Sequence, residues 1–284
     1  MQSIIIDKKY DGKNLSKVLL DTFSGLTTDT FYKALRKKDI RINNIRTNKN
    51  DIVHTGDEVK IFVIDELLYH SFTPEIVYED ANILVINKPA GIEVTGDSNS
   101  LTSCLKKSQN FFIEPCHRLD RNTTGLVLFA KNNVSLEILL NKFKNHEIEK
   151  RYLATVYGIP KIEKQTITSY LFKDNKKSLV YISDKPQKGY VKIITSYSVV
   201  EKHTKENYSI LDVTLHTGKT HQIRAHLAHI GHPILGDGKY GNNQINKKFG
   251  YKTQKLCSYS LTFHFSTDSG ILNYLNGKNI KLAQ

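Results

Sequence analysis

The sequence predicts an α+β protein that consists of a small N-terminal unit and a larger C-terminal unit. Short apolar strands mix with amphipathic helices along the chain in no regular βαβ order, which is typical of α+β proteins. The lack of a regular βαβ repeat also argues against a dinucleotide-binding fold. The 284 residues, of which 39% are hydrophobic, are enough to bury a substantial core.

The composition indicates a polyanionic partner. The chain has 41 Lys and Arg against 28 Asp and Glu, a formal net charge of +13, and such an excess repels itself unless it meets negative charge. Nucleic acid is the first interpretation, an anionic membrane surface the second, and a merely lysine-rich proteome the third. No apolar run of ~18 residues and no signal-peptide pattern is found, so we expect no membrane span and a cytoplasmic location.

Residues 1–64 are predicted to form the small unit. Asn14 or Asp11 is expected to cap a helix whose apolar positions follow a helical spacing and form one buried stripe, namely Leu15, Val18, Leu19 and Phe23. A second helix is expected from about residue 28 to 37, with Phe31 and Leu35 on its apolar side. Strands are expected at 40–42 and 59–63.

The end of the second helix is strongly basic. Lys33, Arg36 and Lys37 lie on or beyond its last turn, and Arg41 follows in the next strand. A run of charges is most often a solvated helix face. Here the order of two helices, a basic turn and a hairpin, with the sequence RKKDIRINNIRTNKNDIVHTGDEV, resembles the α-L RNA-binding module over residues 13–63.

Residues 65–75 are predicted to be a linker, and residues 76–284 form the larger unit. Its predicted strands are 83–86, 125–131, 152–157 and 211–216. A helix over 135–145 is expected to have Leu136, Leu139, Leu140 and Phe143 on one side, and the polar stretch 173–188 is expected to be an exposed loop or hairpin.

A dense polar cluster precedes the predicted strand at 125–131. Arg118 and Asp120 are two residues apart, so in an extended segment their side chains point the same way. A carboxylate between arginines stays ionised, because nearby positive charge favours the charged form. An ionised carboxylate is what a carboxylate nucleophile requires. A structural Asp–Arg pair at a turn is the alternative.

A helix is predicted to begin at Thr217 or Thr220 and to end at Gly231. Ile223, Leu227 and Ile230 form its apolar stripe, and Arg224 lies at the edge of that stripe. A covered guanidinium needs an anionic partner, and Asp120 is the candidate.

The same helix carries several histidines, which suggests a metal site. His221 and His229 are eight residues apart, about 12 Å along a helix, so the two cannot bind one ion. Only His226 and His229 have a suitable spacing, and no HExxH pattern supports them. The sequence therefore predicts no metal, although a metal-dependent hydrolase stays an alternative.

Four segments together resemble the RluA-type RNA pseudouridine synthases: EDANILVINKPAG (79–91), HRLDRNTTGLVLFAK (117–131), KRYLATVYG (150–158) and LHTGKTHQIRAHLAHIGHPILGDGKYG (215–241). Their order and spacing match over about 200 residues, and the HRLDxxTxG block is highly specific. The resemblance implies a catalytic domain with a mixed, mainly antiparallel central sheet and flanking helices. It implies isomerisation of uridine to pseudouridine in RNA, without a cofactor.

The resemblance also implies roles for individual residues. Asp120 would be the nucleophile, which attacks C6 of the uracil or C1′ of the ribose, and Arg224 would pair with it. Tyr152 would stack on the uracil and help to remove the C5 proton, and Arg118 would occupy the space left by the flipped nucleotide. We expect further RNA contacts from Arg121, Lys150, Lys219 and His221, and from Lys33, Arg36, Lys37 and Arg41 in the N-terminal unit.

The expected activity is therefore that of an RNA pseudouridine synthase acting as a monomer on structured RNA. Large-subunit rRNA is favoured as the substrate because of the N-terminal module, and tRNA is the alternative. A non-catalytic RNA-binding or ribosome-assembly protein is the second class of function. It explains the positive charge but not the combination of Asp120, Tyr152 and Arg224.

Overall fold

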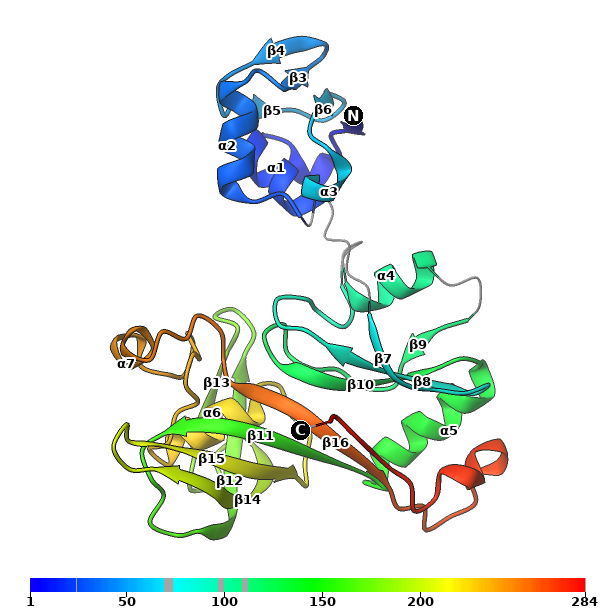
Figure 1. Ribbon diagram of the computed structural model, residues 1–284, viewed down its shortest axis with the longest axis vertical. Coiled ribbons are helices and arrows are strands. Elements are labelled where there is room, and N and C mark those ends of the chain that lie inside the picture. Colours follow the sequence, from blue (N-terminus) through cyan, green and yellow to red (C-terminus); the bar gives the residue numbers. More distant parts are fainter. Residues whose placement is uncertain (24, 69–73, 97–99, 109–111, 284) are drawn as a thin grey trace. The chain divides into compact units, whose positions relative to one another are not determined.

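A computed structural model describes residues 1–23, 25–68, 74–96, 100–108 and 112–283. The chain divides into two compact units, Met1–Thr73 and Pro74–Gln284 (Figure 1). Each unit has its own hydrophobic core and is described by itself. Among the described residues, no helix is long and apolar enough to cross a membrane.

The N-terminal unit packs short helices against a small antiparallel sheet of order β1-β6-β3-β4. The sheet strands are β1 (Gln2–Ile5), β6 (Glu58–Ile61), β3 (Ile40–Ile42) and β4 (Ile45–Thr47), and β2 (Lys13–Asn14) pairs separately with β5 (Ile52–Val53). The helices are the 3-10 turn η1 (Lys8–Tyr10), α1 (Leu15–Thr22), α2 (Thr28–Arg36) and α3 (Asp65–Leu68).

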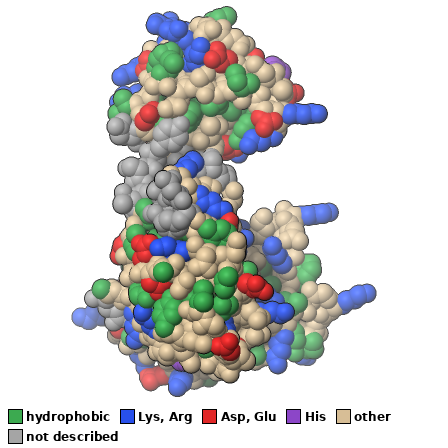
Figure 2. All heavy atoms as spheres, turned by 90° about the vertical axis from the view of Figure 1, so that its right-hand side faces the viewer, with side chains coloured by type: hydrophobic (Ala, Val, Ile, Leu, Met, Phe, Trp, Pro, Cys, Tyr) green, Lys and Arg blue, Asp and Glu red, His purple; other side chains and the backbone are tan. Residues whose placement is uncertain are grey.

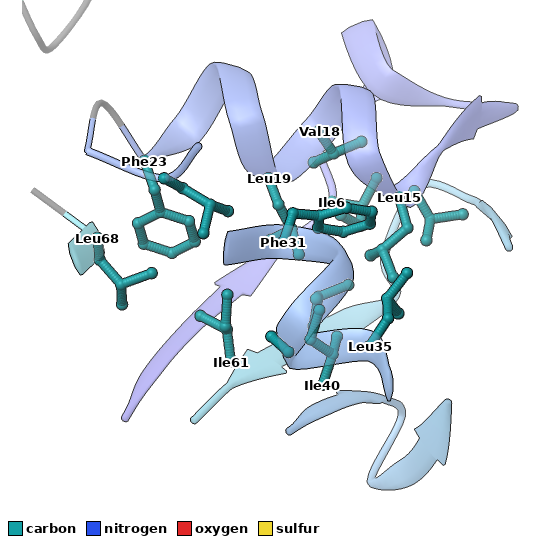
Figure 3. Close-up of a cluster of buried hydrophobic side chains, with 14 residues drawn as sticks. Ile6, Leu15, Val18, Leu19, Phe23, Phe31, Leu35, Ile40, Ile61 and Leu68 are labelled. Carbon is teal, nitrogen blue, oxygen red and sulfur yellow. The ribbon is translucent and has the colours of Figure 1, made fainter. Parts of the chain in front are cut away.

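The core of this unit contains the predicted stripes. Leu15, Val18, Leu19 and Phe23 of α1 and its C-cap meet Phe31 of α2 in one buried cluster (Figure 3). Asn14 occupies the N-cap position of α1 as predicted, but its side chain makes no capping bond. The amide of Ser16 instead donates to Oδ1 of Asn50 at 2.7 Å, so this helix start is capped from a distant loop.

The structure differs from the prediction at the segment 65–75. Residues 65–68 form α3, Leu68 is fully buried in the N-terminal core, and its carbonyl accepts from the amide of Gly25 at 2.9 Å. Residues 69–73 lie outside the described residues, and β7 begins at Glu75. An apolar side chain therefore attaches the start of the predicted linker to the N-terminal unit.

The C-terminal unit confirms the α+β fold class and contains one large mixed sheet. In the described residues, the strand order is β13-β12-β14-β15-β11-β16-β10-β8-β7, with β9 on β10 and β17 on β16. Only the β10–β16 pair is parallel among the described pairs. The strands are β7 (Glu75–Glu79), β8 (Ile83–Lys88), β9 (Glu114–Pro115), β10 (Thr124–Ala130), β11 (Ile148–Tyr157), β12 (Lys164–Asp174), β13 (Leu179–Ser183), β14 (Val191–His203), β15 (Tyr208–Leu215), β16 (Leu256–Phe263) and β17 (Asn279–Lys281).

Helices lie beside the sheet: α5 packs against β10, and α6 packs against β13 and β14 (Figure 1). The helices of this unit are α4 (Leu101–Ser108), α5 (Asn133–Lys144), α6 (Gln222–His229), α7 (Asn243–Lys248) and the 3-10 helix η2 (Gly270–Leu275). The predicted strands are present, and the polar stretch 173–188 contains the turn of the β12–β13 hairpin.

Two helix predictions need correction. Leu140, expected on the apolar side of its helix, is 47% exposed, whereas Leu139 is fully buried, so the side of α5 that contacts the core is narrower than the apolar stripe. The helix with Arg224 begins at Gln222, later than Thr217 or Thr220. His221 has a left-handed backbone with φ of 53°, so the preceding residues cannot continue into the helix.

The short parallel contact between β10 and β16 brings the loop before β10 next to β11. Gly125, with φ of +106°, lies so close to Ser258 that a Cβ atom would be 2.1 Å from the Ser258 carbonyl oxygen. Ser258 is in turn the β16 neighbour of Tyr152 on β11. Only glycine permits this approach, which sets the loop carrying Asp120 beside the strand carrying Tyr152.

Candidate active site

A pocket of about 770 Å³ opens in the C-terminal unit between the loop before β10, strand β11 and the loops on either side of α6. The structure brings together in it all predicted site residues of this unit, which are Arg118, Asp120, Arg121, Lys150, Tyr152, Lys219, His221 and Arg224. The other predicted RNA contacts, Lys33, Arg36, Lys37 and Arg41, belong to the N-terminal unit.

Asp120 and Arg224 form the ion pair that the sequence analysis anticipated. Nη1 of Arg224 donates to Oδ2 of Asp120 at 2.9 Å. The Asp120 side chain remains 23% exposed in the pocket, whereas that of Arg224 is only 10% exposed. Oδ1 of Asp120 has no hydrogen-bond partner among the described residues. One carboxylate oxygen is thus oriented by Arg224, and the other is free to react.

A second carboxylate, Asp237, binds the other edge of the Arg224 guanidinium. Nε donates to Oδ2 of Asp237 at 2.7 Å, and Nη2 donates to Oδ1 at 3.0 Å. The amides of Lys239 and Tyr240 also donate to Oδ1. Burial alone would raise the pKa of Asp237, but the hydrogen bonds and charge of Arg224 hold it below its ordinary value.

Sequence reasoning missed Asp237, because a Gly-Asp-Gly sequence is typical of an exposed turn. The available signal was the guanidinium itself. Arginine has five N–H donors in a fixed planar fork, so a buried arginine needs more acceptors than the single carboxylate of Asp120 can supply.

The loop carrying Asp120 is fastened to the loop after β8. Lys88, fully buried, donates from Nζ to the carbonyls of Pro89, Ile92 and Arg121 at 2.7–3.0 Å. Burial lowers the pKa of Lys88 to about 8, so the ammonium is still protonated at neutral pH. Arg121, predicted to contact RNA, donates from Nε to the carbonyl of Gly91 at 2.9 Å. Sequence reasoning did not identify this role of Lys88.

Tyr152 forms one wall of the pocket. It is 5% exposed and lies on the pocket face of β11, while its neighbour Arg151 points to the opposite face and pairs with Asp212. Burial, and secondarily the charge of Asp120, raises the pKa of Tyr152 well above its ordinary value. The ring therefore stays a neutral phenol at physiological pH.

The histidine at the N-cap of α6 and the two histidines within this helix have different partners. Nδ1 of His221 lies 2.8 Å from the Tyr240 hydroxyl, and Nε2 lies 4.0 Å from Oδ2 of Asp120. Burial lowers the pKa of His221. His226 is fully buried between Thr195 and Ser169, and His229 contacts Asp184. Among the residues that the structure describes, no group of three or more His, Cys, Asp or Glu side chains could bind a metal ion.

This arrangement can perform nucleophilic chemistry on a flat ligand that carries negative charge elsewhere. The pocket combines an oriented carboxylate with one free oxygen, a neutral aromatic wall and several cations at its rim, including Arg118 and Lys219, both exposed. A carboxylate nucleophile attacks an electrophilic carbon, and the aromatic wall can stack on a planar ring.

Known proteins resemble this chain over most of its length. Ribosomal large subunit pseudouridine synthase C of Buchnera aphidicola subsp. Acyrthosiphon pisum is 31% identical, over 92% of this chain and 88% of the relative. The protein of the same name from Rickettsia bellii is 35% identical, over 81% and 83%. An uncharacterized RNA pseudouridine synthase of Mycoplasma capricolum is 32% identical, over 99% and 97%.

The fold is also that of a solved structure. Human RNA pseudouridylate synthase domain containing 1 matches 75% of this chain and 91% of its own length, with a TM-score of 0.58 at 23% identity. A sequence model of one family, described as RNA pseudouridylate synthase, matches residues 82–229, which include the loop of Asp120, Tyr152 and all of α6. This chain belongs to the RNA pseudouridylate synthase family, and it is an isomerase that converts uridine to pseudouridine in RNA.

Proposed function

We propose that the chain modifies large-subunit rRNA and that Asp120 is its nucleophile. Two of the relatives are named as large-subunit enzymes, which supports this RNA as the substrate. The observation that supports the nucleophile is the state of its two oxygens: Arg224 binds Oδ2 at 2.9 Å, and Oδ1 of this pocket-lining residue has no hydrogen-bond partner among the described residues.

The reaction breaks the bond between N1 of uracil and C1′ of ribose and forms one between C5 and C1′. N1 gains a proton, and C5 loses one. Asp120 would form a transient ester with C1′ or an adduct at C6, and either route frees the base to rotate before it rejoins. Because such an adduct removes the negative charge of Asp120, Arg224 keeps Asp237 as a counter-ion throughout the reaction.

The target base has to leave its stack, because the carbons of a stacked nucleotide are inaccessible to a carboxylate. Unstacking costs a few kcal/mol, which the pocket must offset. Tyr152, a buried neutral ring, would stack on the uracil, and its raised pKa makes a phenolate base unfavourable at neutral pH. Arg118 is exposed and has no partner among the described residues, so it is free to fill the gap in the RNA.

The N-terminal unit would bind RNA away from the reacting base. Lys33, Arg36 and Lys37 are exposed on and after α2, and the guanidinium of Arg41 lies 4.8 Å from the centre of the Phe62 ring. Figure 2 shows lysine and arginine side chains at the surface of each unit. Such cations bind phosphates regardless of sequence and make affinity depend on salt.

The purified chain and its Asp120→Asn variant test this function with unmodified transcripts of large-subunit rRNA and tRNA labelled with 5-³H-uridine. We expect the wild type to release tritium from the rRNA, and the variant to lose turnover by about 10⁴-fold or more while it binds RNA within a few-fold. Pseudouridine mapping then identifies the modified position. Release only from tRNA would contradict the rRNA substrate, and substantial turnover by the variant would contradict the nucleophile.

A further inference from the structure

Among the described lysines in or beside the pocket, Lys88 and Lys150 are the two that are not exposed, and they differ in what surrounds their ammonium groups. Lys88 is saturated, because three backbone carbonyls accept from its Nζ. Lys150 makes no hydrogen bond or ion pair with any residue that the structure describes. Its ammonium instead makes a cation–π contact with the Phe143 ring, whose centre lies 5.0 Å from Nζ.

Lys150 points into the pocket because of its position on β11. It precedes Tyr152 by two residues, so the two side chains share one face of the strand. Both line the pocket. Nζ of Lys150 also lies close to the loop before α6, since a Cβ atom on Gly218 would be 3.8 Å away. Glycine at 218 therefore leaves space beside the ammonium.

Among the residues that the structure describes, no acidic side chain compensates the charge of Lys150. Burial lowers its pKa, and no neighbouring acid raises it again. Asp120 is bound by Arg224, and Asp212 is bound by Arg151 on the other face of the strand. His117, beside Lys150, is neutral, because burial lowers its pKa to about 3. A partly buried cation without a counter-ion is unfavourable unless an anion from outside binds it.

We propose that Lys150 binds a phosphodiester group of the RNA backbone directly next to the target uridine. This inference rests on the proposed function, which brings a flipped nucleotide into this pocket. Uracil is neutral, whereas each linkage of RNA carries one negative charge, so the unpaired ammonium matches the phosphate and not the base. A lysine binds phosphate as a point charge and needs no particular orientation.

Two residues of β11 would then bind different parts of the same nucleotide. Tyr152 would contact the base and Lys150, two residues earlier, would bind the backbone that carries it. Phosphate contacts fix the register of a nucleic acid on its protein. The phosphate would thus place the ribose over Asp120 before the base is committed to reaction.

The test measures the dissociation constant of the full chain for a short RNA that carries the mapped uridine, at several salt concentrations. Lys150→Met is expected to weaken binding about ten-fold, and to reduce the magnitude of the log–log salt slope by about 0.7–0.9, the loss of one phosphate contact. Lys150→Arg should restore most of the affinity. Lys205→Met, which removes an exposed lysine in the β14–β15 turn, should change neither quantity.

A second arm replaces single linkages of the RNA by uncharged methylphosphonates. One flanking replacement should weaken the wild type as much as Lys150→Met does, and should weaken the variant no further. Additive losses at every linkage, or an unchanged slope for Lys150→Met, would overturn the inference. An unfolded Lys150→Met chain would also contradict it, because removal of an unpaired buried charge should leave the thermal midpoint equal or higher.

Both arms measure binding alone. If the mapped uridine lies in tRNA, or if Asp120→Asn keeps its turnover, the proposed function is contradicted, while the comparison of charged and uncharged linkages beside that uridine still tests Lys150.

Discussion

The core of the N-terminal unit buries apolar side chains, whereas the pocket of the C-terminal unit buries charged ones. Around Phe31 and Leu19, the described buried side chains are apolar and enclose no charge, so each contact stabilises the unit independently of precise orientation. Around Arg224, burial encloses charges, and every group depends on a partner at hydrogen-bond distance. Apolar packing in the first region therefore stabilises the fold, whereas the charged contacts in the second region fix the orientation of the pocket's side chains.

The largest expected effect lies in the apolar region. Phe31→Ala leaves a cavity in the core of the N-terminal unit and should destabilise that unit by about 3–5 kcal/mol. Amide hydrogen exchange in α1 and α2 of the full chain measures this loss, and amides of β10 should keep their protection. The adjacent Tyr32→Ala, at a 43% exposed position, is the control and should cost far less. Equal losses for both variants would contradict an apolar core centred on Phe31.

The next effect concerns the charged region. Asp237→Asn should lower kcat about 100-fold with a smaller change in KM, because Arg224 loses the partner that orients it toward Asp120. In an Arg224→Lys background the same substitution should cost much less, since Asp237 acts through Arg224.

The control for Asp237 is Asp184→Asn, which removes a 79% exposed carboxylate paired with His229. We expect it to leave kcat unchanged. If the losses in kcat from Asp237→Asn and Arg224→Lys simply add, Asp237 does not act through the guanidinium. The charged groups of the pocket would then not depend on one another for their orientation.

A smaller effect is expected on the outer surface of the N-terminal unit. Replacing Lys33, Arg36 and Lys37 by Gln together should raise the Kd for rRNA about ten-fold at 0.15 M salt and reduce the magnitude of the salt slope by about 2–3, while kcat stays constant. The matched control removes the same charge at Lys8, Lys9 and Lys13. Identical losses from both triple variants would mean that net charge matters and the α2 surface does not.

The smallest expected effect is the pH dependence of the stability that Asp237 contributes. The pKa of Asp237 is lower in the folded chain than its ordinary value of 3.8, so its stabilising contribution is present above about pH 4 and is lost as the pH falls through the folded-state pKa. The difference in unfolding free energy between wild type and Asp237→Asn should therefore shrink below about pH 4. Urea unfolding between pH 2.5 and 7 measures it, and a constant difference would contradict the charged pair.

Local patterns predicted the apolar region well. The stripe Leu15, Val18, Leu19 and Phe23 was readable because helical periodicity is a short-range property. The burial of Leu68 was not readable, since one leucine in a polar segment carries no period. The exposure of Leu140 was not readable either, because periodicity gives the width of the buried stripe only approximately.

The charged region was predicted in part. The pairing of Arg224 with Asp120 followed from the rule that a covered guanidinium needs an acid. That rule says how much negative charge is needed but not where it comes from, so Asp237 was missed. Lys88 was missed because its partners are backbone carbonyls, which every residue has and no sequence pattern marks.

Periodicity, motifs and charge are properties of neighbouring residues. They were therefore enough to predict the class of fold, the family, and the acidic, basic and aromatic side chains that line the pocket. Only the tertiary contacts show which oxygen of Asp120 is free, which acid orients Arg224, and that the half-buried ammonium of Lys150 has no acidic partner among the described residues. These depend on distances between residues up to 104 positions apart, which only the close contact of β10 with β16 and the packing of α6 bring together.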